Sequence, residues 1–197
     1  MAWFAGGGAA VLVLGGLVFL LVRGPAAPTA GPAPVAPFAE GTGAGAGGGA
    51  PDISNLSPRE RFDRLFDRVM RAAESGDEAT VTTFSPMAIS AYQMLDTVDT
   101  DARYDAALIR LHTGDIAGAT ALADTILKEA PGHLFGYVLR GTVARFQKNQ
   151  AVLDRSYRDF LAHYDAELRT KRPEYELHSR AIEDFRRAAL ERKRTTP

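Results

Sequence analysis

The residues most able to do chemistry in this chain are four histidines, and their spacing does not match a metal-binding motif. They are His112, His133, His163 and His178. None belongs to a His-Glu-x-x-His pair. The chain has no cysteine, so a zinc site would need carboxylates gathered from distant helices. We expect His178 to be a core or boundary residue and His133 to lie in a turn, and the sequence predicts no metal site.

A second group of reactive side chains surrounds a predicted helix start and consists of Asp96, Asp99, Asp101 and Asp105. A calcium loop needs ligands at regular alternating positions around a central glycine, and that glycine is missing. Helix capping and compensation of the helix dipole explain these carboxylates better. The chain also lacks a Gly-x-Ser-x-Gly motif, a phosphate loop and a dinucleotide fingerprint. We therefore expect no catalytic residue and no cofactor, with an unrecognised enzyme as the remaining alternative.

The charges are balanced overall but unevenly placed along the chain. There are 23 Lys and Arg residues against 24 Asp and Glu residues, a net charge of −1. This balance gives no reason to expect a nucleic-acid partner. Only Arg23 and Glu40 are charged before Asp52, which predicts a charged domain carried by an uncharged leader.

The leader begins with an uncharged stretch that predicts a transmembrane anchor at residues 1–23. As a helix, residues 3–22 would reach about 30 Å, enough to cross a bilayer core. Trp3 and Arg23 suit the two interfaces. The strongly apolar block, residues 11–22, also has the length of a signal-peptide core, but no Lys or Arg precedes it and no Ala-x-Ala site follows closely. We expect an uncleaved, single-pass anchor with an extracytoplasmic domain; a cytoplasmic domain is the alternative.

Residues 24–56 form a linker between the anchor and the charged domain. Nearly all residues from 24 to 51 are Pro, Ala, Gly or Thr. The proline-rich first half should be extended and the glycine-rich second half flexible. Such a composition cannot bury enough apolar surface to fold alone.

The remaining residues, 57–197, have helical periodicity and predict an all-α domain. Ser57-Pro58 followed by Glu60 marks a helix start, and Gly76-Asp77 marks the turn after it. A short helical piece is predicted for residues 78–84, with the chain restarting at Ser85-Pro86.

Residues 100–133 carry the pattern of a helix–turn–helix repeat. Small Ala107 suits a close crossing of two helices, Gly114-Asp115 suits the turn, and Pro131 suits the end of the second helix. With Ala119, these positions resemble one tetratricopeptide repeat, a unit of about 34 residues. Arg103 and Arg110 depart from that family's pattern, because they stand where it prefers aromatics.

A second copy, residues 134–167, follows in register. It keeps Tyr137, Gly141 and Tyr157 at family positions. It departs from the family pattern at three places. Lys148-Asn149 replaces Gly-Asp in the turn, Leu153 replaces a small residue, and Asp165 replaces the closing proline. We expect this second pair to be splayed and to run to about residue 169. The hairpin at 58–97 is interpreted as a degenerate repeat.

After Pro173, a C-terminal capping helix is predicted at residues 174–192. It carries one stripe made of Tyr175, His178, Ile182, Phe185 and Ala189.

The resemblance implies a protein-interaction module whose concave face is lined by the first helix of each pair. The partner-binding residues carried over are Tyr104, Leu108, Leu111, His112, Phe135, Val138, Thr142, Arg145 and Phe146, with Asp101 on the same face. Such a face suits an amphipathic helix or an apolar strand of another protein. Alternatively, the N-terminal hairpin or the final helix fills the groove.

The function expected is a non-catalytic accessory subunit or scaffold of a membrane complex, with an energy-transducing complex as one candidate. Its partners would be other protein subunits, and the bilayer through residues 3–22. The alternative is an envelope chaperone that holds clients at the membrane.

Overall fold

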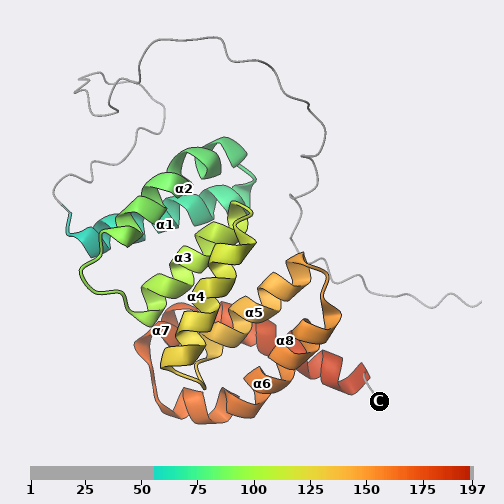
Figure 1. The fold of residues 1–197 in the computed structure, drawn as a ribbon. Helices are drawn as coiled ribbons and strands as arrows, with labels where there is room; N and C mark the ends of the chain where they lie inside the picture. The colour runs from blue at the N-terminus through green and yellow to red at the C-terminus, as the bar shows by residue number, and fades with distance from the viewer. Residues whose placement is uncertain (1–55, 196–197) are drawn as a thin grey trace, which may run out of the picture. The chain divides into compact units, whose positions relative to one another are not determined.

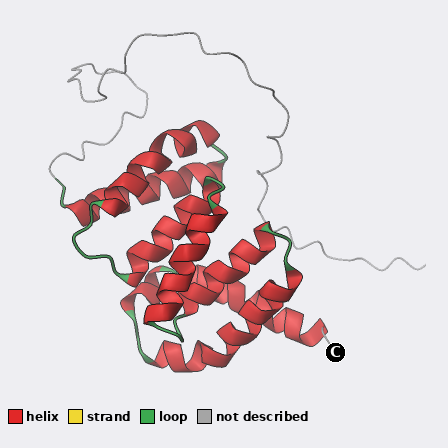
Figure 2. Cartoon of the chain, in the orientation of Figure 1, coloured by secondary structure: helices red, strands yellow, loops and turns green. Residues whose placement is uncertain are grey.

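The computed structural model describes residues 56–195, and every regular element in that part of the chain is a helix (Figures 1 and 2). The prediction of an all-helical fold is thereby confirmed for these residues. The helices are α1 Pro58–Ser75, α2 Glu78–Gln93, α3 Thr100–His112, α4 Ile116–Glu129, α5 Leu134–Phe146, α6 Gln150–Arg169, α7 Pro173–Leu177 and α8 Ser179–Thr195.

The first six helices form three hairpins whose turns share one backbone geometry. In each turn a single residue adopts the left-handed conformation: Gly76 with φ 75°, Gly114 with φ 79° and Lys148 with φ 54°. Glycine adopts this region without a steric cost, whereas lysine does not. The turn at Lys148 therefore has the same shape as the other two, despite the loss of the Gly-Asp sequence.

The residue after each left-handed position closes the turn and caps the next helix. The backbone N–H groups of Asp77, Asp115 and Asn149 donate to the carbonyls of Ala72, Arg110 and Ala144, each at 2.8 Å. Their side chains then accept from the N–H groups of Thr80, Gly118 and Val152, at 3.0, 2.8 and 3.2 Å. These bonds satisfy backbone groups that helix ends leave without partners. Three hairpins with one closing pattern are consistent with internal repetition.

Helix α3 lies between two hydrophobic clusters and contributes to both. One side of it presents Ala102, Ala106 and Ile109 to a cluster built with α1 and α2. Its other side presents Tyr104, Ala107 and Leu111 to a larger cluster shared with α4, α5, α6, α7 and α8. The first hairpin is thus joined to the rest of the domain through α3, while the second and third hairpins share the larger cluster, in which α4 also packs on α5.

The C-terminal helix α8 packs on α5 and α6, and its contact with α5 depends on a glycine. A Cβ atom placed on Gly141 would lie 2.5 Å from the ring of Phe185. The Phe185 ring also packs against Tyr157 and Phe160, with centroids 4.9 and 5.0 Å apart. The sequence predicts a small residue at position 141 where two helices cross. In the structure, Gly141 leaves space mainly for Phe185 of α8.

Two predicted helix boundaries are wrong. The chain does not restart at Ser85-Pro86, because α2 continues without a break from residue 78 to 93, with Pro86 inside it. A proline within a helix removes one backbone hydrogen bond. Ser85, Ala88 and Ala91 are nevertheless buried along one side of α2 against α1, and this packing favours a continuous helix.

The predicted capping helix at 174–192 is instead two helices. The chain breaks at His178, between α7 and α8, where φ is −109° and ψ is 25°. The residues Tyr175, Ile182, Phe185 and Ala189 are buried as their stripe predicted. His178 is only partly buried, and the break directs its side chain towards α3. The predicted end of the second pair near residue 169 is confirmed by the end of α6 at Arg169.

The predicted anchor, residues 1–23, and all but the last residue of the predicted linker, 24–56, lie outside the described residues. Among the helices at residues 58–195, none is both long enough and apolar enough to cross a bilayer.

Candidate functional site

The nine residues predicted to bind a partner divide into a buried group and an accessible group. Tyr104, Leu111, Phe135 and Val138 are buried, each with less than a tenth of its surface exposed. Leu108, His112 and Thr142 are half-buried, and Arg145 and Phe146 are exposed. The buried four contact the protein's own core, so only the other five are available to a partner.

All four buried residues belong to the larger core cluster, and two of them, Tyr104 and Phe135, are covered by the protein's own C-terminal helices. The rings of Tyr104 and Phe135 stack with centroids 4.1 Å apart. His178 meets both rings edge-on, at 4.8 and 5.2 Å, and Tyr175 meets Phe135 at 5.4 Å. The sequence left two alternatives for filling this face, and over Tyr104 and Phe135 the structure has the last helices and not the N-terminal hairpin.

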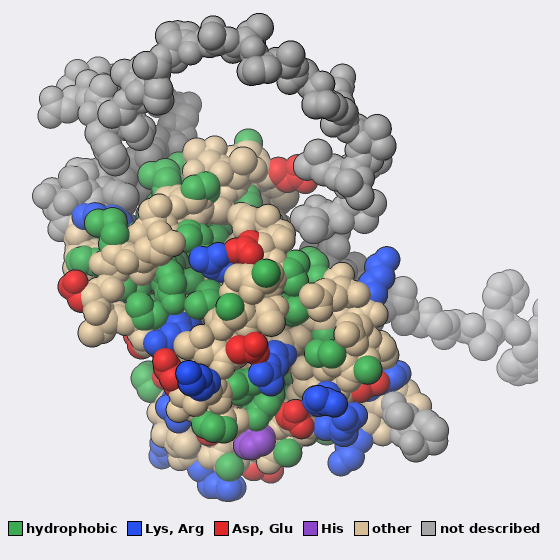
Figure 3. Space-filling model, viewed as in Figure 1, with side chains coloured by type: hydrophobic (Ala, Val, Ile, Leu, Met, Phe, Trp, Pro, Cys, Tyr) green, Lys and Arg blue, Asp and Glu red, His purple; other side chains and the backbone are tan. Residues whose placement is uncertain are grey.

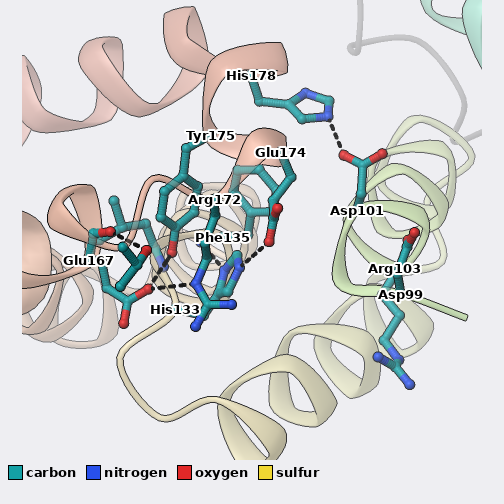
Figure 4. A network of polar contacts seen from close by, with 12 residues as sticks. Asp99, Asp101, Arg103, His133, Phe135, Glu167, Arg172, Glu174, Tyr175 and His178 are labelled. Atoms are coloured by element: carbon teal, nitrogen blue, oxygen red, sulfur yellow. Dashed lines mark hydrogen bonds and ion pairs between the residues drawn. The ribbon is translucent and has the colours of Figure 1, made fainter.

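A buried polar network fixes α7 in this position (Figure 4). The hydroxyl of Tyr175 accepts from the N–H of Leu134 at 3.0 Å and donates to Glu167 Oε2 at 2.7 Å. His133, fully buried, caps α5: its Nδ1 accepts from the N–H of Phe135 at 3.3 Å, and its Nε2 lies 3.2 Å from Glu174. The turn that the sequence predicts at His133 therefore also holds α7 in place, through the contact with Glu174.

The protonation state of His133 follows from these bonds. Because Nδ1 accepts a backbone hydrogen bond, the neutral ring carries its proton on Nε2 and donates it to Glu174. Burial lowers the pKa of His133, and this effect exceeds the opposite effect of Glu174. The ring is therefore a neutral structural group at physiological pH.

A second cluster joins α3 to the break between α7 and α8 and contains Asp101, Asp105 and His178. His178 Nε2 lies 2.9 Å from Asp101 Oδ1 and 3.4 Å from Asp105 Oδ1. One ligand-capable atom from each side chain lies within 4.8 Å of the others. Figure 4 shows His178 pointing from the end of α7 to Asp101. Of the four aspartates predicted to cap the helix start, Asp99 does so, through the N–H of Ala102, while Asp101 and Asp105 form this cluster instead.

Arg59 of α1 completes the surroundings of the cluster. Its guanidinium donates to Asp63 and Asp99, each at 2.7 Å, and to Asp101 Oδ2 at 2.6 Å. Asp101 therefore has one oxygen directed to Arg59 and the other to His178. These contacts bring the N-terminal hairpin, α3 and the C-terminal helices together at one point.

The two carboxyl groups of the cluster have opposite pKa shifts. Burial opposes ionisation of Asp101, but hydrogen bonds from His178 and Arg59 outweigh it and lower the pKa of Asp101. Burial, reinforced by the charge of Asp101, raises the pKa of Asp105 to about 9. Asp105 Oδ1 has no hydrogen-bond partner, since the nearby His178 nitrogen lies beyond good hydrogen-bonding geometry. The cluster can therefore hold a proton or a cation.

The sequence alone does not reveal this cluster, because its members are far apart in the chain. His178 and Asp101 are separated by 77 residues. The usable signal was the spacing of Asp101 and Asp105, which places both on one face of a helix. No local feature of the sequence shows which face of α3 the histidine reaches.

A shallow hollow of about 370 Å³ lies elsewhere, between α4, α5 and α6. It is lined by Asp124, Leu127, Lys128, Pro131, Tyr137, Arg140 and Asp159. Arg140 and Asp124 pair at its rim, 2.8 Å apart. None of the nine predicted partner residues lines this hollow.

Comparisons with protein-family models, with curated proteins and with solved structures found no match.

Proposed function

We propose that this protein is a non-catalytic interaction subunit that assembles or stabilises a multi-subunit membrane complex. In this proposal residues 1–23 anchor the chain, 24–56 form a spacer, and the helix pairs, similar to tetratricopeptide repeats, bind another subunit. The observation that carries the proposal is the accessible remainder of the predicted partner face. We call it the α3–α5 strip: Leu108, His112, Thr142, Arg145 and Phe146.

The chemistry of the α3–α5 strip suits an amphipathic helix of another protein. Phe146 is 40% exposed and Leu108 is half-buried, so both offer apolar surface. Arg145 donates to the hydroxyl of Tyr157 at 2.6 Å, and this bond fixes the orientation of its guanidinium. Apolar anchors next to a few oriented polar groups are typical of helix-in-groove binding.

The face drawn in Figure 3 supports a protein partner rather than a nucleic acid. On the face in Figure 3, Lys and Arg side chains are interspersed with Asp and Glu. Hydrophobic side chains gather over the N-terminal helices of the same face. A nucleic-acid site would instead require a continuous basic surface.

The test is native purification of the full chain from its own membranes in a gentle detergent, followed by mass spectrometry. A constitutive subunit should bring fixed partners in stoichiometric amounts. Phe146→Glu should release them, because a charge at the centre of an apolar contact is costly. The matched control is Leu190→Glu on α8, since Leu190 is 41% exposed and lies outside the α3–α5 strip.

The other outcomes separate the alternatives. Substoichiometric recovery of varied unfolded proteins would favour a chaperone. Recovery of a monodisperse monomer would overturn the subunit proposal. Equal loss of partners with Phe146→Glu and Leu190→Glu would reject the α3–α5 strip as the site. A reporter fused after Pro197 tests the proposed extracytoplasmic location against a cytoplasmic one.

A further inference from the structure

The Asp101–Asp105–His178 cluster has the composition of a metal-binding site. It supplies one imidazole nitrogen and two carboxylates, and all three groups are held on helices or at a helix junction. Asp101 and Asp105 are one helical turn apart on α3, and His178 comes from the break between α7 and α8. Zinc sites without cysteine use this combination of His and carboxylate ligands.

An independent observation, the unpaired oxygen of Asp105, also points to a missing ligand. The Asp105 side chain is only 6% exposed, and its Oδ1 atom makes no hydrogen bond. A buried polar atom left without a partner is costly and uncommon in folded proteins. The atom lies 3.4 Å from the His178 nitrogen, so it faces into the cluster.

The distances within the cluster suit a bound ion. Ligand bonds of about 2.0–2.2 Å place neighbouring ligand atoms about 2.8–3.6 Å apart in octahedral or tetrahedral sites. His178 Nε2 lies 2.9 Å from Asp101 Oδ1 and 3.4 Å from Asp105 Oδ1. Side-chain rotations alone could bring all three atoms onto one ion, because they already lie within 4.8 Å of one another.

The surrounding charges favour a cation and orient its ligands. Asp63 and Asp99 also lie here and share the Arg59 guanidinium with Asp101, so negative charge exceeds positive charge around the cluster. Arg59 binds Asp101 through Oδ2, which leaves Oδ1 directed to His178. Such an outer contact holds a ligating carboxylate in one orientation.

We propose that Asp101, Asp105 and His178 bind a divalent first-row transition-metal ion, most suitably Zn²⁺, which fastens the α7–α8 segment to α3. A mixed nitrogen and oxygen set favours such ions over Mg²⁺ and Ca²⁺, which prefer oxygen alone. The ion would hold the C-terminal helices over Tyr104 and Phe135. The proposal is independent of the interaction function, because its ligands lie outside the α3–α5 strip.

The test uses the full chain in detergent with a histidine-free affinity tag, stripped with a chelator and then dialysed. Calorimetric titration with Zn²⁺ should show one high-affinity ion per chain, and the Tm should rise with Zn²⁺ concentration. Mg²⁺ and Ca²⁺ should leave the Tm unchanged. Co²⁺ should give a visible absorption spectrum characteristic of a mixed nitrogen and oxygen site.

Substitutions assign the ligands. Asp105→Asn and His178→Gln should each weaken Zn²⁺ binding at least about tenfold and remove the Zn²⁺-dependent rise in Tm. The matched control is His163→Gln, since His163 is a half-buried histidine on α6 whose bond is to the Asp159 carbonyl. Circular dichroism in chelator checks folding, and Asp101→Asn replaces any variant that fails to fold.

Three results would overturn the proposal. The first is the absence of stoichiometric Zn²⁺ binding to the unmodified chain. The second is Zn²⁺ binding that persists in the folded Asp105→Asn and His178→Gln variants, which would place the ion elsewhere. The third is a larger rise in Tm with Mg²⁺ or Ca²⁺ than with Zn²⁺, which would reject the proposed class of ion.

Discussion

The ring of Tyr104 on α3 stacks on the ring of Phe135 on α5, with the two centroids 4.1 Å apart and the planes inclined by 25°. Both residues are almost fully buried. Their positions in the sequence suggest a surface for partners, yet both rings lie in the protein's own core. The stack joins two consecutive hairpins, and the edges of the Tyr175 and His178 rings close it.

Phe135→Ala should therefore act on stability and not on binding. Removing a fully buried phenylalanine leaves a cavity between Tyr104, His133 and Tyr175, and we expect the free energy of unfolding to fall by about 3–5 kcal/mol. Denaturant unfolding followed by circular dichroism measures this change. Phe146→Ala is the control, because that ring is 40% exposed and its removal should cost less than about 0.5 kcal/mol. Equal losses in the two variants would contradict the buried position of Phe135.

Gly141→Ala should destabilise the protein, although alanine is the better helix former. The new methyl group would overlap the Phe185 ring, and overpacking of this kind costs about 1–3 kcal/mol, against a gain of about 1 kcal/mol in helix propensity. In the double variant Gly141→Ala, Phe185→Leu the smaller side chain on α8 should relieve part of the loss. A double-mutant cycle of unfolding free energies measures this coupling. A stabilised Gly141→Ala variant would show that α8 does not pack closely on α5.

Lys148→Gly should stabilise the third hairpin. Lys148 adopts φ 54°, a region that costs a residue with a side chain about 1–2 kcal/mol. Glycine removes this cost but loses more entropy on folding, so we expect a net gain of up to about 1 kcal/mol in unfolding free energy. Thermal unfolding detects a gain of this size as a higher Tm. In the reverse control, Gly114→Ala should lower the Tm, because Gly114 has φ 79° in the equivalent turn.

His133 should make the protein less stable in mild acid. Its pKa is lowered by burial, so below the unfolded value of about 6.5 the unfolded chain takes up a proton that the folded chain does not. The free energy of unfolding should then fall as the pH drops, by at most about 1.4 kcal/mol per pH unit, until the pH reaches the folded pKa. The contribution of neutral His133 to the free energy of unfolding is fully present above about pH 6.5.

The comparison is with His133→Asn, which keeps a side-chain oxygen able to cap α5 but has no titrating group. Unfolding free energies of both proteins between pH 7.5 and 5 should show a shallower decline for the variant. His112, whose pKa burial also lowers, is present in both proteins and cancels in the comparison. Identical pH profiles would mean that His133 does not stay neutral in the folded state.

Most of the helices can be predicted from the sequence, because the signals that specify them are local. A cap such as Ser57 with Glu60, a glycine after a helix end, and apolar residues three and four apart act within one or two turns. The same kind of local signal led to the wrong prediction that a new helix starts at Ser85-Pro86. There, the local effect of proline was weaker than the packing of α2 along α1, which the sequence does not display.

Tertiary packing sets which of the predicted site residues are accessible and which partners the charged residues contact. His178 breaks the predicted capping helix and reaches Asp101, 77 residues earlier in the chain. The same docking of α7 and α8 buries Tyr104 and Phe135. These outcomes depend on how α3 is placed against the C-terminal helices. Periodicity shows that one face of α3 is buried, but not which distant side chain it meets, because that choice depends on packing across the whole domain.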